Sequence, residues 1–264
     1  MSRIAVAATA PFGADVLERL AQRHEVVHVL TRPDRPRGRG RRLAPPRAKV
    51  AAERLGIPVA QPERLDGAVD LGADVVVVVA YGLLVPESLL ERALWLNVHP
   101  SLLPRWRGAA PVERAIMAGD ERSGVSIIKL VRELDAGPIA TQADVEIPID
   151  WTAGDFYAAA AEAADELVAD ALRDRRFVPQ AEEGVTYAEK ITAADRELDW
   201  SRPAKEIHDR IRALSPHIGA RGIVDGRELI VWRSRLTDGR VELLEVQPSG
   251  GRRMTYEEYL RGLR

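Results

Sequence analysis

The sequence contains no cysteine among its 264 residues. Disulfide bonds, zinc–thiolate sites, iron–sulfur clusters and cysteine nucleophiles are therefore excluded, which fits a reducing compartment. Long apolar runs are also missing, because Pro11 cuts the run near the start and no other stretch reaches the length of a membrane-spanning helix. We therefore expect a cytoplasmic protein with no membrane partner.

Nucleotide-binding and metal-binding motifs are missing as well. A dinucleotide-binding domain needs G-x-G-x-x-G after its first strand, because bare backbone approaches a pyrophosphate there. Here that turn, at 7–13, reads AATAPFG, and the G-x-G at 38–40 has no strand before it. No Walker loop occurs, and the histidines outside the main motif show no metal-ligand spacing. We expect neither NAD nor a metal ion.

Charge is balanced overall but concentrated at one place. The formal net charge of −2 argues against a uniformly basic nucleic-acid binder. Seven arginines nevertheless lie between residues 32 and 47 against the single acid Asp34, which gives this stretch a formal charge of +6. The stretch is a candidate site for a polyanion.

Short apolar runs alternate with amphipathic stretches over the first 100 residues, which predicts an α/β fold. The predicted strands are 4–8, 26–30, 57–60, 74–80 and 94–98, and the predicted helices are 13–23, 48–55 and 86–92. Five consecutive valines at 75–79 are typical of a strand covered on both faces, and hence of a mostly parallel sheet. A long helix should follow the capping-box sequence at 152–155 and end near Arg173.

The remainder of the chain predicts a second, smaller domain. We expect a catalytic domain at 1–180, a polar linker at 181–201 and a helix-plus-β domain at 202–264. Ile207, Ile211 and Leu214 form a helical stripe. The β-like runs at 222–224, 229–232 and 241–246 are separated by two Asp-Gly dipeptides, which are typical of hairpin turns.

Polar side chains stand at the end of the predicted strand at 94–98, where open α/β sheets place their sites. Asn97 and His99 are two residues apart and so share a strand face. Asp135 lies in the turn LDAGP, which can return a carboxylate to the same edge. An amide, an imidazole and a carboxylate suit acyl transfer to an amine, which needs an oxyanion donor and a proton acceptor. From spacing alone, a structural role for the Asn-x-His pair remains the more frequent interpretation.

The surrounding residues carry a more specific signal. NVHPSLLP at 97–104, Gly108 and LDAGPI at 134–139 together resemble the signature of the folate-dependent formyltransferases. The resemblance implies a Rossmann-like N-terminal domain, an OB-like helix-plus-β-barrel C-terminal domain, 10-formyltetrahydrofolate as formyl donor, and Asn97, His99 and Asp135 as catalytic residues. It places eight residues beside the folate, namely Tyr81, Gly82, Leu83, Leu84, Ser101, Leu102, Leu103 and Pro104.

The arginine stretch bears on the acceptor. Residues 31–43 resemble the loop of methionyl-tRNA formyltransferases that enters the acceptor-stem groove. Guanidinium groups pair with phosphates, while Gly and Pro keep such a loop mobile until nucleic acid orders it. The resemblance implies an enzyme of translation initiation, with aminoacylated initiator tRNA and a reduced folate as partners. We expect the protein to act as a monomer. The expected tRNA contacts are Arg35, Arg37, Arg39, Arg41 and Arg42.

The C-terminal region departs from the family pattern, because it is some tens of residues shorter than usual. A hairpin or more of the expected small barrel is missing. Either the arginine stretch then carries more of the tRNA contact, or the acceptor is smaller than a tRNA. Two alternatives therefore stay open: formylation of a nucleotide-linked amino sugar, and a non-catalytic RNA-binding protein on the same scaffold.

Overall fold

The computed structural model describes residues 2–37, 42–66 and 69–263, and the chain forms two compact units. The first unit comprises Met1–Arg107, Gly124–Asp144 and Ala158–Val185, and the second comprises Gly108–Ser123, Val145–Tyr157 and Thr186–Arg264. Over the described ranges, no helix is long and apolar enough to cross a membrane.

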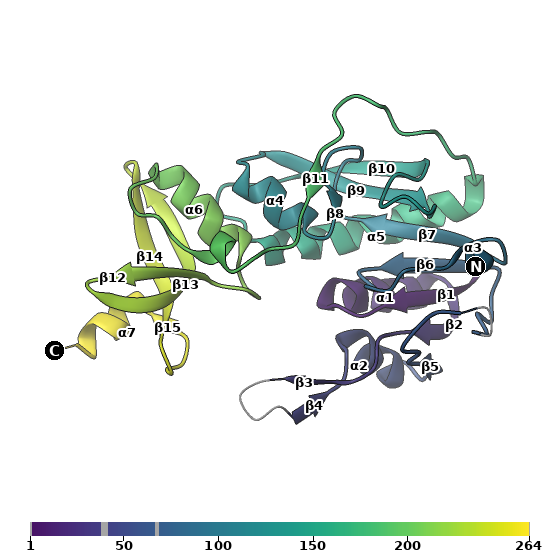
Figure 1. Cartoon of the computed structure of the whole chain (residues 1–264), viewed down its shortest axis with the longest axis horizontal. Coiled ribbons are helices and arrows are strands. Elements are labelled where there is room, and N and C mark those ends of the chain that lie inside the picture. The colour runs from purple at the N-terminus through teal and green to yellow at the C-terminus, as the bar shows by residue number, and fades with distance from the viewer. Residues whose placement is uncertain (1, 38–41, 67–68, 264) are drawn as a thin grey trace. The chain divides into compact units, whose positions relative to one another are not determined.

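A seven-stranded sheet with the order β10-β9-β7-β6-β1-β2-β5 forms the centre of the first unit (Figure 1). Five neighbouring strands run parallel, and β9 runs antiparallel to β7. The mostly parallel α/β fold predicted from the sequence is confirmed. The strands are β1 (Arg3–Ala8), β2 (Glu25–Leu30), β5 (Val59–Ala60), β6 (Val75–Val79), β7 (Leu94–His99), β9 (Arg122–Lys129) and β10 (Ile139–Glu146).

The central strands form where the sequence predicted them because both of their faces are covered. All five valines of β6 are buried, and five of the six residues of β7 are buried. Trp95 of β7 is 1% exposed and donates its indole N–H to the carbonyl of Leu89 at 2.8 Å. Strands β9 and β10, which extend the sheet beyond β7, were not predicted from the sequence.

The three helices predicted within the first 100 residues are present as α1 (Pro11–Arg23), α2 (Arg47–Arg54) and the shorter α3 (Glu87–Leu90). Helix α4 (Pro111–Met117) was not predicted, and α5 (Ala153–Asp174) is the predicted long helix. Reciprocal bonds cap α5: Thr152 N donates to Asp155 Oδ2 at 2.8 Å, and Asp155 N donates to Thr152 Oγ1 at 3.3 Å. The capping box predicted at 152–155 is therefore confirmed.

Four antiparallel strands in the order β12-β13-β14-β15 form the sheet of the second unit. Asp225-Gly226 and Asp238-Gly239 have φ of 49°, 73°, 51° and 73°, as two-residue hairpin turns require, so both predicted turns are confirmed. The elements are β12 (Ala220–Val224), β13 (Arg227–Thr237), β14 (Arg240–Pro248), β15 (Met254–Thr255), α6 (Ala204–Ala213) and α7 (Tyr256–Arg261). Shorter elements are β8 (Arg107–Gly108), β11 (Tyr187–Ala188) and the 3-10 turn η1 (Ala194–Arg196).

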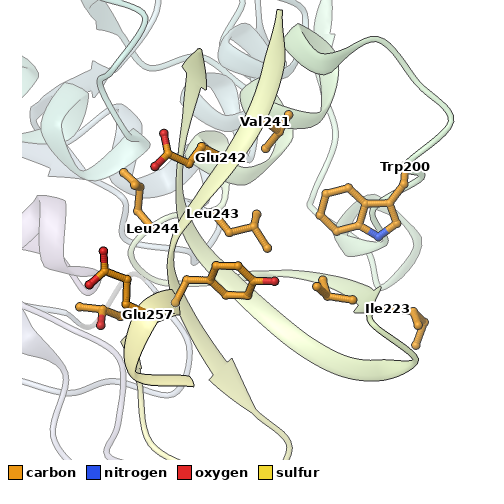
Figure 2. A pocket seen from close by; sticks show the side chains of 10 residues that line it. Trp200, Ile223, Val241, Glu242, Leu243, Leu244 and Glu257 are labelled. Atoms are coloured by element: carbon orange, nitrogen blue, oxygen red, sulfur yellow. The ribbon is translucent and has the colours of Figure 1, made fainter. Parts of the chain in front are cut away.

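The second unit has an apolar groove of about 750 Å³ on one face of this sheet. Side chains alternate along β14, so Val241 and Leu243 point toward Trp200 and Ile223, whereas Glu242 lies on the opposite side (Figure 2). Ile223 is 60% exposed. Among the described residues β12 and β15 are the edge strands of this antiparallel sheet, which confirms the helix-plus-β C-terminal fold predicted from the sequence.

Candidate active site

The three predicted catalytic residues meet at the carboxyl end of β7. Asn97 and His99 lie on that strand, and Asp135 lies in the turn after β9; their exposed fractions are 9%, 4% and 8%. Asn97 Nδ2 donates to Asp135 Oδ1 at 3.1 Å, and His99 Nδ1 lies 3.6 Å from Asp135 Oδ2. The structure thus brings an amide, an imidazole and a carboxylate together.

Both ring nitrogens of His99 face acceptors. Nε2 lies 2.8 Å from the carbonyl oxygen of Trp106, and a carbonyl only accepts, so Nε2 carries a proton. Nδ1 faces the carboxylate of Asp135. A second proton taken up at Nδ1 would therefore find an anion beside it, which suits His99 to accept a proton from a reacting group.

The LDAGP turn owes its shape to a close backbone approach. A Cβ on Gly137 would lie 1.8 Å from the carbonyl oxygen of Lys129, so only glycine fits. Lys129 N donates to the carbonyl of Pro138 at 3.0 Å, and Asp135 has a left-handed φ of 48°. The turn therefore aims the Asp135 side chain back at β7.

The predicted folate loop at 101–104 is held by buried hydroxyl groups. Ser101 Oγ donates to the carbonyl of Arg105 at 2.7 Å, and Ser126 Oγ donates to the carbonyl of Ser101 at 2.6 Å. Ser126 Oγ also accepts from Leu103 N at 3.1 Å and from Gln142 Nε2 at 2.7 Å. Ser101 and Leu103 are thus buried inside the loop, whereas Leu102 and Pro104 are partly exposed.

The second predicted folate segment, at 81–84, leaves the same edge of the sheet, because β6 and β7 are parallel neighbours. Tyr81 is buried with no hydrogen-bond partner for its hydroxyl among the described residues. This burial raises the pKa of Tyr81 to about 12, against the opposing effect of Arg32. Gly82 has φ 79°, Leu83 is partly buried, and Leu84 is 88% exposed.

The flanks of the arginine stretch form a hairpin of β3 (Arg35–Arg37) and β4 (Arg42–Ala44), which projects from the first unit (Figure 1). No strand was predicted here from the sequence, because Pro and Gly are poor strand formers. Arg35 and Arg42 are exposed, and of Arg37 only the backbone is described. Arg39 and Arg41 lie outside the described residues.

Asp34, at the base of this hairpin, is engaged away from the arginines of β3 and β4. Its Oδ1 accepts from Gln61 Nε2 at 2.7 Å and from Lys49 Nζ at 3.0 Å. Hydrogen bonds from Gln61 and Lys49 hold the pKa of Asp34 below its usual range. The one acid of the stretch thus anchors the hairpin base to α2 and to the residue after β5.

The cluster of Asn97, His99 and Asp135 can serve acyl transfer without a metal. Asn97 has one N–H left that could donate to a developing oxyanion, His99 could accept a proton, and Asp135 could provide the negative charge beside it. Within the described ranges, no group of three or more His, Asp or Glu side chains is arranged to hold a metal ion.

Comparison with known proteins identifies the family. Residues 2–172 match the family described as formyl transferase, and residues 190–240 match the formyl transferase C-terminal domain. The chain belongs to the formyl transferase family. It is therefore an enzyme, and the resemblance found in its sequence motifs is confirmed.

One curated relative illustrates how far the similarity extends. The chain is 42% identical over 290 residues to the methionyl-tRNA formyltransferase of Paracoccus denitrificans, covering 99% of this chain and 97% of the relative. The alignment is longer than the 264 residues of this chain, so the relative contains residues with no counterpart here.

Solved structures of formyl transferases share the fold. The methionyl-tRNA formyltransferase from Clostridium thermocellum matches with a TM-score of 0.70 at 15% identity, over 94% of this chain and 99% of that chain. The sugar 3N-formyl transferase WlaRD matches with a TM-score of 0.66 at 16% identity, over 90% and 87%. Fold alone therefore does not separate a tRNA acceptor from a sugar acceptor.

Several polar residues around the site were not predicted from the sequence. Ser126 and Gln142 hold the loop at 101–104, and Arg107 and Gln180 bond near Asp135. Ser126 interrupts an apolar run of β9, and a lone hydroxyl in such a run is a sequence signal that could have been used. Nothing in the local sequence marks Gln180.

Proposed function

We propose that this formyl transferase moves the formyl group of 10-formyltetrahydrofolate to the free amino group of methionyl-initiator tRNA, in translation initiation. The observation that carries this proposal is the 42% identity to a methionyl-tRNA formyltransferase over nearly the whole of both chains. The contacts among Asn97, His99 and Asp135 support the same chemistry.

In the proposed reaction the acceptor amine attacks the formyl carbon, forming a C–N bond and a tetrahedral oxyanion. Asn97 donates one Nδ2–H to Asp135, and its second N–H would donate to the oxyanion. His99 Nδ1 would take the proton that the amine loses, with Asp135 Oδ2 beside it. When the bond from the formyl carbon to N10 breaks, N10 keeps the electron pair and receives that proton, leaving tetrahydrofolate and the formylated amine.

The folate would lie between the segments 81–84 and 101–104. The exposed Leu84 and the partly exposed Leu102 and Pro104 offer apolar surface for a pteridine ring. The unbonded hydroxyl of Tyr81 supplies hydrogen-bonding capacity at the same edge. Ser101 and Leu103 would act by holding the shape of their loop.

The arginine hairpin would bind the tRNA backbone. Arg35 and Arg42 are exposed, and Asp34 is occupied by Gln61 and Lys49, so the positive charge of the hairpin remains available to phosphates. We include Arg37, Arg39 and Arg41 in this surface on the basis of the family resemblance.

The acceptor is tested by incubating the protein with the folate donor and either methionyl-initiator tRNA or a nucleotide-linked amino sugar. Replacing Arg39, Arg41 and Arg42 by Gln should raise the KM for tRNA about 10- to 100-fold, and each lost phosphate contact should reduce the salt slope of binding by about one. The matched control replaces the exposed Arg173, Arg175 and Arg176 at the end of α5 by Gln, and should leave both quantities unchanged.

Formylation of the amino sugar with no transfer to tRNA would overturn the proposed acceptor. The sugar acceptor is included in the test because the fold resembles a sugar formyl transferase and a tRNA formyltransferase almost equally and so does not separate the two acceptors. If the variant with Arg39, Arg41 and Arg42 replaced by Gln also formylated the sugar with wild-type kcat and KM, the sugar would be the acceptor.

We further propose that the enzyme acts in the cytoplasm as a monomer, with residues 1–180 as catalytic domain, 181–201 as linker and 202–264 as C-terminal domain. Sedimentation at working concentration tests the monomer, and a mass twice that of the 29.1 kDa chain would contradict it.

A further inference from the structure

The side-chain amide of Gln180 forms hydrogen bonds beside the candidate site through both its nitrogen and its oxygen. Its Nε2 donates to the carbonyl of Asp135 at 2.7 Å and to the carbonyl of Gly137 at 2.8 Å. Its Oε1 accepts from Arg107 Nη2 at 2.7 Å and from Arg107 Nε at 3.0 Å. Both N–H groups and both acceptor positions of the amide are thus occupied.

The two segments that Gln180 joins lie on the two sides of His99. On one side, Asp135 presents its carboxylate to His99 Nδ1; on the other, Trp106, which precedes Arg107, presents its carbonyl to His99 Nε2. Asp135 and Trp106 both have left-handed backbone, with φ of 48° and 65°. Such conformations are strained in non-glycine residues and persist only where the surroundings enforce them.

Gln180 is not needed to anchor its own segment. Two residues earlier, Val178 and Ile139 exchange both backbone hydrogen bonds at 2.8 Å. The segment is therefore fixed to the start of β10 before Gln180 is reached. The hydrogen bonds of Gln180 therefore stabilise its partners, which are the Asp135 turn and Arg107.

We propose that Gln180, acting through Arg107, is a positioning residue for formyl transfer that holds the Asp135 turn and the Trp106 carbonyl on opposite sides of His99. This inference rests on the proposed function, in which His99 takes a proton at Nδ1. Gln180 acts through the backbone, so its loss should displace the acceptors of His99 and leave the segments proposed for folate binding in place. A misplacement of about 1 Å at a reacting group is enough for a loss of about 100-fold in rate.

The kinetic test uses Gln180→Ala, Gln180→Glu, Arg107→Ala and the double variant Gln180→Ala/Arg107→Ala. We expect Gln180→Ala to lower kcat about 10- to 100-fold, with the KM of donor and acceptor within about threefold. Gln180→Glu should lower kcat as Gln180→Ala does, because the carboxylate keeps an acceptor for Arg107 but loses the donors to Asp135 and Gly137. The double variant should lose little more than the worse single variant, because the two residues act as one unit.

The matched control is Gln247→Ala in the second unit. Gln247 also bridges two partners through its carboxamide, accepting from Trp232 Nε1 at 3.1 Å and donating to the carbonyl of Gly251 at 3.0 Å. Its removal deletes the same chemical group and should leave kcat unchanged. An equal loss of kcat in Gln247→Ala would assign the effect to general destabilisation and overturn the proposal.

A readout that needs no substrate separates this inference from the proposed function. The chain has five histidines, so ring-nitrogen NMR signals are few, and the spectrum of His99→Gln identifies the signal of His99. Gln180→Ala should move the His99 signal and leave the other four unchanged. An unmoved His99 signal, or movement of all five, overturns the positioning role, whereas a wild-type protein without formyl transfer to tRNA overturns the proposed function alone.

Discussion

Two histidines, one in each unit, are almost equally buried yet differ in what they bond to. His99 and His208 are 4% and 1% exposed, and both ring nitrogens of each have a polar neighbour. His208 Nδ1 lies 2.9 Å from the Ser234 hydroxyl, and its Nε2 lies 2.9 Å from the carbonyl of Ile149. His99 instead has a carbonyl on one side and a carboxylate on the other.

The chemistry of the hydrogen-bonding partners separates a structural histidine from the histidine proposed to accept a proton. The carbonyl of Ile149 accepts a hydrogen bond from Nε2–H, and the Ser234 hydroxyl can donate to Nδ1, so the neutral ring of His208 is fully satisfied. Burial lowers the pKa of His208, outweighing the opposite effect of its bond to Ile149. His99 has no donor facing it in these contacts, and a second proton on its ring gains the Asp135 carboxylate as partner. Burial alone would not have distinguished the two residues.

The largest expected effect is a loss of kcat when His99 is replaced. His99→Gln should lower kcat about 1,000-fold, equivalent to about 4 kcal/mol of barrier, because it removes the proton acceptor. The unfolding midpoint in urea should change little, since glutamine can still donate to the carbonyl of Trp106. Turnover within tenfold of wild type would contradict the assigned role.

A smaller effect is expected from His208. His208→Leu should reduce the free energy of unfolding by about 1–2 kcal/mol, because the Ser234 hydroxyl and the Ile149 carbonyl lose their partner. The kcat per folded molecule should remain at the wild-type level. Urea unfolding and initial rates measured on the same samples check both statements. A loss of kcat comparable to that of His99→Gln would contradict a purely structural role for His208.

The smallest expected effect is a pH dependence of the free energy of unfolding, which His208 causes and which further distinguishes it from His99. Because the pKa of His208 is lower in the folded protein than its ordinary 6.5, the unfolded chain binds a proton first as the pH falls. The contribution of His208 to stability is therefore constant above about pH 6.5 and declines below it, by at most about 1.4 kcal/mol per pH unit.

The measurement compares the free energies of unfolding of wild type and His208→Leu between pH 7.5 and pH 5.5. Their difference should narrow as the pH falls, since only wild type loses the His208 contribution. His24, whose pKa burial also lowers, is present in both proteins and cancels. A difference that is constant with pH would show that His208 titrates alike in the folded and unfolded chains.

Local patterns predicted the elements that local physics determines. Five valines predicted β6, the capping-box sequence predicted the start of α5, and two Asp-Gly dipeptides predicted the hairpins of the second unit. Strands β9 and β10 and the arginine hairpin were missed. β9 and β10 gain their stability from pairing and packing with distant residues, which no window of sequence contains.

The candidate site also has features that the sequence predicted and features that it could not predict. Motif spacing placed Asn97 and His99 on one strand face and indicated Asp135 in a turn, and the structure brings all three into contact. Their catalytic roles remain predictions. The Trp106 carbonyl could not be predicted, because a backbone acceptor carries no sequence signature.

By itself the sequence determined the family, the parallel sheet and the residue types at the carboxyl end of β7, because these depend on apolar patterning and on a contiguous motif. Only the tertiary structure decided that Asp135 reaches Asn97 across 38 residues, that Gln180 reaches the same turn across 45, and that His208 is satisfied as a neutral ring. A side chain's proton-handling role depends on the donors and acceptors that face it, and folding alone brings those partners together.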